Sequence, residues 1–135
     1  MNQKELNIYT DGASRGNPGL ASIGVYIEDA NGNEIQGYKE CLGQKTNNEA
    51  EYIAICKALS LAMDLGASKV NLYSDSLLCV SQITGKWKIK QDHLRDLCMM
   101  IKNKELKFES VKYQHIKREK NKKADALCNE ALDEK

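Results

Sequence analysis

The chain has 135 residues, a mass of 15.2 kDa and a formal net charge of +1, and this length suits one domain with its own core. Apolar residues make up 41% and charged residues 29%, a globular composition that excludes a mainly disordered chain. Apolar runs are too short for a membrane-spanning helix, and no signal segment opens the sequence. We therefore expect a single domain over residues 1–135, in a cytoplasmic protein that avoids membranes and acts as a monomer.

Charge is divided unevenly along the chain. Residues 1–67 carry five basic and nine acidic side chains, whereas residues 68–135 carry fifteen basic and ten acidic ones. Such an asymmetry can place an acidic site beside a basic surface, and this combination suits a polyanion held with the help of metal ions. The five cysteines give no zinc signal, because none lies two or three residues from another. Scattered, reduced cysteines fit the cytoplasm.

The first third of the chain predicts three strands. Apolar and β-branched residues favour strands at residues 6–10, 21–27 and 34–42. The first strand is expected to end at Asp11, followed by a turn-rich loop over residues 12–19. Asn31-Gly32 is the typical signal of a tight hairpin, so the second and third strands should be antiparallel.

The rest of the chain alternates between helices and strands. Thr46 and Glu49 have the spacing of a capping box at the start of a helix that ends at Gly66. Strands joined by hairpins, followed by strands reached through helices, predict an α/β fold with a mixed sheet covered by helices. Helical spacing predicts helices at residues 50–65, 76–83, 92–102 and 121–132, with strands at residues 69–73 and 108–114.

Four acidic side chains lie where predicted elements begin or end. Asp11 follows the first strand, Asp75 follows the fourth, and Glu51 and Asp125 lie in the first turns of two helices. If the first and fourth strands are parallel neighbours, their ends lie ~5 Å apart at the edge where open α/β sheets bind ligands. Two carboxylates at that separation repel by ~3 kcal/mol at an effective dielectric constant of about 20. Such a cluster therefore favours cations between the acids.

The donor types narrow the choice of cation. Oxygen ligands without His or Cys companions favour magnesium or manganese. Two such ions ~3.5–4 Å apart can clamp the attacking and leaving oxygens of a phosphoryl displacement. Each acid also has a purely structural interpretation. Glu51 and Asp125 can interact with helix dipoles, Asp75 can cap the next helix, and Asp11-Gly12 can form a turn.

At these residues the sequence resembles type 1 ribonuclease H, in the short form that lacks a basic protrusion. Four segments match in the order of that family and together span nearly the whole chain, which makes the resemblance specific. They are Tyr9-Thr10-Asp11-Gly12-Ala13-Ser14 with Gly16-Asn17-Pro18-Gly19, then Thr46-Asn47-Asn48-Glu49-Ala50-Glu51, then Tyr73-Ser74-Asp75-Ser76, and finally His115 with Asn121 and Ala124-Asp125.

The resemblance implies a five-stranded mixed sheet in the order 3-2-1-4-5, with strand 2 antiparallel to the others and helices on both faces. It also implies an endonuclease that hydrolyses the RNA strand of an RNA–DNA hybrid by a two-metal-ion mechanism, leaving a 3′-hydroxyl and a 5′-phosphate. Asp11, Glu51, Asp75 and Asp125 would be catalytic and would hold two Mg²⁺ or Mn²⁺ ions, with Asp11 bridging both. Glu51, rather than Glu49, matches the acid of the family motif.

Further residues take roles from the resemblance. It implies that His115 assists proton movement or product release from a loop that looks flexible. The alternative is an exposed histidine at a strand end that has no catalytic role. It implies contacts with the hybrid at a turn formed by Gly12, Ala13 and Ser14, at Asn17, and at the pair Asn47 and Asn48. The two paired asparagines could instead help to start the helix.

The second half of the chain contains aromatic and basic residues that could contact a nucleic acid. Trp87 and Lys88 lie in Lys86-Trp87-Lys88-Ile89-Lys90, a stretch typical of a sugar-phosphate track but also of a core tryptophan between solvated lysines. A basic cluster near Asp125 suits phosphate neutralisation, and it comprises Lys117, Arg118, Lys120, Lys122 and Lys123.

Two alternative functions stay open. Leu77 stands where the family often has glutamine, which favours a nucleic-acid-binding domain with weak or no catalysis. The other alternative is a nuclease that also cleaves double-stranded RNA.

Overall fold

A computed structural model describes residues 4–134 of the chain. Its five strands form one sheet in the order β3-β2-β1-β4-β5. β2 is antiparallel to β1 and β3, whereas β4 is parallel to β1 and to β5. The predicted strand order and directions are therefore confirmed. The strands are β1 (Glu5–Gly16), β2 (Gly19–Asp29), β3 (Glu34–Lys45), β4 (Lys69–Ser74) and β5 (Ser110–His115).

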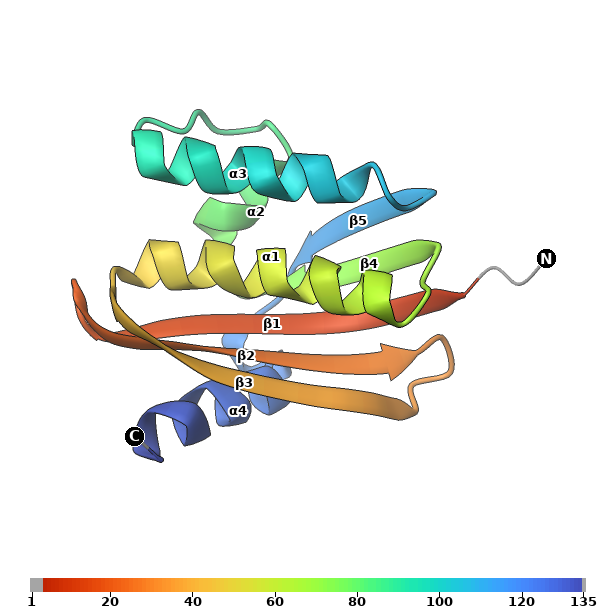
Figure 1. The fold of residues 1–135 in the computed structure, drawn as a ribbon, viewed down its shortest axis with the longest axis horizontal. Coiled ribbons are helices and arrows are strands. Elements are labelled where there is room, and N and C mark those ends of the chain that lie inside the picture. Colours follow the sequence, from red (N-terminus) through yellow and green to blue (C-terminus); the bar gives the residue numbers. More distant parts are fainter. Residues whose placement is uncertain (1–3, 135) are drawn as a thin grey trace.

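Helices cover both faces of this sheet, as expected. In Figure 1, α1, α2 and α3 lie on one side of the sheet and α4 lies on the other. No helix within residues 4–134 is long and apolar enough to cross a membrane. The helices are α1 (Asn47–Asp64), α2 (Leu77–Ile83), α3 (Asp92–Glu105) and α4 (Lys122–Asp133), and a short 3-10 helix, η1 (Arg118–Lys120), precedes α4.

The main core lies between the sheet and α1. Alternate residues of β1 and β4, such as Leu6 and Leu72, point to α1 and are fully buried, as the two-residue period of a strand requires. Ile55 and Leu59 of α1 pack in the same cluster. Thr46 caps α1 through a reciprocal capping box, in which Thr46 Oγ1 accepts from Glu49 N and Glu49 Oε1 accepts from Thr46 N. The predicted capping box is confirmed.

The predicted end of the first strand is wrong. β1 continues past Asp11 to Gly16, and residues 12–14 pair with β2 instead of forming a turn. The strand that does end at this level is β4, the parallel neighbour of β1, whose last residue Ser74 pairs with Thr10. Gly12 serves a close approach to α1, since a Cβ atom would lie 2.3 Å from Ala50 C. Residues 12–16 contain no large apolar side chain, so the sequence does not indicate that they pair with β2.

α4 rests on the opposite face of the sheet at a second glycine. A Cβ atom on Gly24 would lie 2.2 Å from Ala124 O and 2.7 Å from Cys128 N. Ser22 of the same strand donates to Cys128 O at 2.6 Å. This contact places the first turn of α4, which carries Asp125, over the middle of the sheet.

We expect Gly24→Ala to destabilise the protein by about 2–3 kcal/mol, because the methyl group would overlap with backbone atoms that cannot rotate away. Gly37→Ala is a matched control on the adjacent strand, where a Cβ atom would meet the flexible Leu127 side chain at 3.4 Å. Urea unfolding of both variants tests the prediction. Equal midpoints for the two variants would contradict this account of how α4 is seated.

Candidate metal centre

Three acidic side chains from three different elements meet at one point. Asp11 lies in β1 where β4 ends, Asp75 follows β4, and Glu51 lies near the start of α1. One carboxylate oxygen from each lies within 4.8 Å of those from the other two. The expected convergence of the strand ends therefore occurs in the structure, although Asp11 lies within its strand rather than at its end.

The fourth acid faces the same space from α4. Asp125 accepts a hydrogen bond from Asn129 Nδ2 at 3.4 Å and lies 3.6 Å from the Arg118 guanidinium. It lines the same hollow as Asp11. Together these residues enclose a hollow of about 260 Å³, which we call the acidic hollow. It is lined by Asp11, Gly12, Ala13, Asn47, Glu51, Asp75, Arg118, Asp125 and Asn129.

Glu51 is not a surface residue that merely interacts with the dipole of α1. Only 6% of it is exposed, and its Oε1 accepts a hydrogen bond from Gly12 N at 2.9 Å. Glu49 instead caps the helix, so the two acids of this motif have different environments. The capping interpretation of Asp75 is wrong too, because Ser76 is the N-cap of α2 and accepts from Cys79 N.

Burial and mutual repulsion make the cluster a poor place for bare negative charge. Burial, then the nearby Asp75 and Asp125 carboxylates, raise the pKa of Asp11 to about 8. Burial, then Asp11 and Asp75, raise the pKa of Glu51 well above its usual value. The Arg118 guanidinium acts in the opposite direction on both. An all-oxygen donor set of this kind fits hard divalent cations such as magnesium or manganese.

Asn121 connects the elements that carry the acidic side chains, and its sequence position alone predicts no role for it. It is 1% exposed, and its Nδ2 donates to Thr10 O at 2.8 Å and to Asp75 Oδ2 at 3.2 Å. It thereby links β1, the end of β4 and the start of α4. Its Oδ1 is buried and has no hydrogen-bond partner among residues 4–134. Nothing in its sequence surroundings indicates these contacts beyond its place four residues before Asp125.

His115 occupies a different kind of position from the one expected. It is the last residue of β5, paired with Ser74, rather than part of a flexible loop. Its side chain is exposed, and it is not among the residues that line the acidic hollow. The catalytic role of His115 stays a prediction.

The expected substrate-contacting residues fall into two groups. Asn47 lines the acidic hollow together with Gly12 and Ala13. Ser14 and Asn17 are hydrogen-bonded to Asn47, since Asn47 Oδ1 accepts from Ser14 N at 3.3 Å and Asn17 Oδ1 accepts from Asn47 N at 3.1 Å. Asn48 lies beside them, half-buried in the first turn of α1.

The second group lies between α2 and α3. Trp87 is 46% exposed, so the interpretation as a core tryptophan is wrong. Lys88 is exposed next to it. The backbone of this segment is held by bonds from Lys86 N and Trp87 N to Ser81 O. Neither Trp87 nor Lys88 lines the acidic hollow.

Comparisons with known proteins agree with this fold and site. The profile of the family described as "Reverse transcriptase-like" matches residues 9–131. "Ribonuclease HI" of Halobacterium salinarum is 38% identical over 96% of this chain, and the RNase H1 structure from that organism superposes with a TM-score of 0.95, covering 97% of this chain and 99% of the other at 37% identity. "Ribonuclease H" of Clostridium botulinum is 36% identical over 97% of both chains.

One solved relative carries a ligand that bears on function. LC11-RNase H1 in complex with an RNA/DNA hybrid has a TM-score of 0.91 at 39% identity, covering 96% of this chain and 97% of that one. The sheet order, the meeting acids and these matches define a ribonuclease H fold. The chain belongs to the type 1 ribonuclease H family. It spans 65% of the length of the Halobacterium relative and 35% of the mycobacterial relatives that it matches.

Proposed function

We propose that the protein is an endonuclease that hydrolyses the RNA strand of RNA–DNA hybrids and leaves a 3′-hydroxyl and a 5′-phosphate. The observation that carries this proposal is the meeting of Asp11, Glu51 and Asp75 within 4.8 Å, with the first two acids buried. The hybrid bound by the similar LC11-RNase H1 supports the substrate class. The basic residues around Asp125 suit a polyanionic substrate.

The four acids supply the ligands for divalent ions. Asp11, Glu51, Asp75 and Asp125 would hold two Mg²⁺ or Mn²⁺ ions. When bound, the ions would activate the attacking water and stabilise the leaving 3′-oxygen. The protein orients the ligands in advance, because Gly12 N fixes Glu51 and Asn121 Nδ2 fixes Asp75.

Neighbouring residues would position the hybrid. Gly12 and Ala13 line the hollow and Ser14 continues the same extended strand, so their backbone can approach the RNA strand, whose 2′-hydroxyls distinguish it from DNA. Asn17, Asn47 and Asn48 would contact the two strands from the same edge. Trp87 and Lys88 would contact the sugar-phosphate backbone farther along the duplex, and His115 would assist proton movement or product release.

One chain contains all four acids, so we infer that the protein acts as a monomer. Within residues 4–134 the five cysteines have free thiols, and four of them are buried. This use of cysteine suits the reducing cytoplasm, which we infer to be its compartment.

The decisive experiment compares three end-labelled duplexes of one sequence: an RNA–DNA hybrid, double-stranded RNA and double-stranded DNA. With Mg²⁺ or Mn²⁺ we expect internal cuts in the RNA of the hybrid, with 5′-phosphate ends on the downstream fragments. Chelation of the metal should stop cleavage. Equal cleavage of double-stranded RNA would establish the broader nuclease, and binding without product under either ion would establish a binding domain instead.

A further inference from the structure

The sheet face that carries α4 is covered only in part. α4 packs on β2, with further contacts to β1 and β3. Beyond α4, this face carries half-buried polar and aromatic side chains from β1 and β4, and exposed polar side chains from β5. A sheet face of this composition is open to a ligand and is separate from the acidic hollow.

Three tyrosines form a row across this face. Tyr26 of β2 pairs with Tyr9 of β1, which pairs in turn with Tyr73 of β4. The rings of Tyr9 and Tyr73 are stacked, with centroids 4.8 Å apart and planes 18° apart. Tyr26 lies on the other side of Tyr9, with its centroid at 6.3 Å and its plane tilted by 50°. We call these three residues the tyrosine row.

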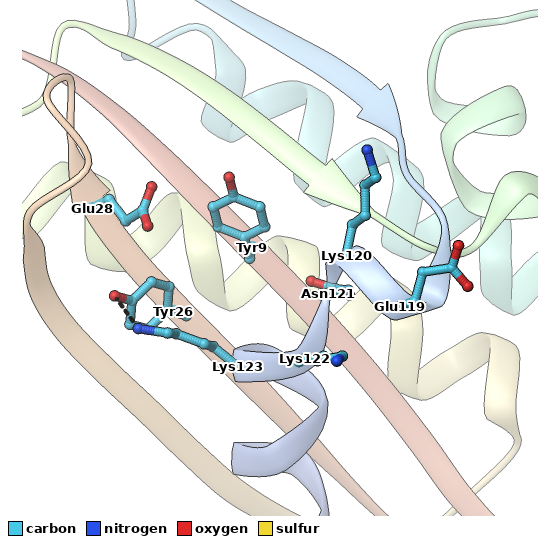
Figure 2. A pocket seen from close by; sticks show the side chains of 8 residues that line it. All are labelled: Tyr9, Tyr26, Glu28, Glu119, Lys120, Asn121, Lys122 and Lys123. Atoms are coloured by element: carbon cyan, nitrogen blue, oxygen red, sulfur yellow. Dashed lines mark hydrogen bonds between the residues drawn. The ribbon is translucent and has the colours of Figure 1, made fainter.

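Each tyrosine of the stacked pair borders a hollow. Tyr9 and Tyr26 line one of about 280 Å³, in which Glu28 and Lys120 lie on opposite sides of Tyr9 (Figure 2). Tyr73 lines another of about 240 Å³, together with Asn71, Leu72, Lys112, Tyr113 and Gln114. Tyr26 is buried, and every nucleobase has a flat π-face, so bases entering the hollows would stack against the rings of Tyr9 and Tyr73.

Four lysines lie around the row, together with the acidic Glu28 and Glu119. Lys120 and Lys122 border the Tyr9 hollow, and Lys112 borders the Tyr73 hollow. Lys123 is tied to the row itself, since its Nζ lies 4.7 Å from the Tyr26 centroid and donates to the Tyr26 hydroxyl at 3.1 Å. These cations can neutralise phosphates on both sides of the stacked pair.

Acceptor groups at the rims distinguish between nucleic acids. The Glu28 carboxylate borders the Tyr9 hollow, and the Gln114 side chain borders the Tyr73 hollow. A carboxylate repels phosphate but accepts a hydrogen bond from a ribose 2′-hydroxyl, which DNA lacks. We propose that the tyrosine row binds single-stranded RNA, with bases in both hollows, phosphates on the lysines and 2′-hydroxyls on Glu28 and Gln114.

This inference goes beyond hybrid cleavage and is tested without it. A fluorescently labelled uridine decamer is titrated with the full-length protein in the absence of divalent ions, and its anisotropy is followed. We expect salt-sensitive binding that Tyr73→Leu weakens about tenfold, because one stacking surface is lost. Tyr73→Phe should restore binding to within about twofold of the unmodified protein, because the ring remains.

Matched controls distinguish the loss of RNA binding at the tyrosine row from the effects of removing any tyrosine or of unfolding the protein. Tyr38 also has a lysine over its ring, Lys57 Nζ at 4.8 Å, but it packs against the α1 core, so Tyr38→Leu should leave RNA binding unchanged. Thermal melting of each variant reports whether the fold is intact. A deoxyuridine decamer has the same bases without the 2′-hydroxyl and should bind more weakly.

Three results would overturn the assignment: no binding of the uridine decamer, equal losses in Tyr73→Leu and Tyr38→Leu, or equal affinity for the two decamers. Failure of hybrid cleavage is measured in a separate assay with metal, so it bears on the proposed function and not on this surface.

Discussion

We expect Asp11→Asn to lower the rate of hybrid cleavage about a thousandfold, while the protein stays folded. Asp11 lies within reach of Glu51 and Asp75 and lines the same hollow as Asp125, so its carboxylate is central to any pair of ions held there. Losing several kcal/mol of transition-state charge stabilisation corresponds to this change in rate. The measurement is single-turnover cleavage of the labelled hybrid at saturating metal.

Glu49→Gln is the matched control for this prediction. Glu49 is an acid of the same sequence motif as Glu51, but it caps α1, and glutamine can also complete a capping box. We expect near-normal cleavage from Glu49→Gln. If Asp11→Asn cleaves the hybrid as fast as Glu49→Gln does, the acidic hollow is not the catalytic site.

The second large effect concerns stability against pH in the metal-free protein. The pKa of Asp11 is raised to about 8, chiefly by burial and by Asp75, and that of Glu51 is raised for similar reasons. Between the ordinary pKa of an aspartate and pH 8, the folded state therefore binds protons that the unfolded state has lost. Stability must fall as the pH rises through this window. Below this pH window, both carboxyl groups are protonated in the folded and the unfolded state, so stability no longer depends on pH through them.

We expect the free energy of unfolding without metal to be a few kcal/mol lower at pH 8 than at pH 5. Asp11→Asn should flatten this dependence and should be more stable than the unmodified protein at pH 8, since the amide needs no proton. Mg²⁺ or Mn²⁺ should stabilise the unmodified protein more at pH 8 than at pH 5, because deprotonated carboxylates bind the ions. Chemical unfolding at both pH values, with metal and with chelator, measures these differences. A metal-free stability that rises between pH 5 and pH 8 would contradict the account.

Local signals in the sequence were sufficient for much of the fold. The capping box at Thr46, the hairpin at Asn31-Gly32 and the period of each helix depend on residues within a few positions of one another. The identities of Asp11, Glu51, Asp75 and Asp125 were also readable, since acids at the ends of apolar elements stand out. Their convergence followed from the strand order that the family resemblance implied.

The sequence by itself therefore determined the main elements, their order along the chain and the identities of the candidate acids. The tertiary structure decided how far β1 continues beside β2, that Asn121 reaches Asp75 across 46 residues, and that Tyr9, Tyr26 and Tyr73 share one face. It also decided that His115 belongs to β5. These features depend on strand register and on backbone contacts such as that of Gly24 with α4. Register is fixed by which face of each strand is buried, and that depends on elements distant in the sequence, so a short stretch of sequence does not contain it.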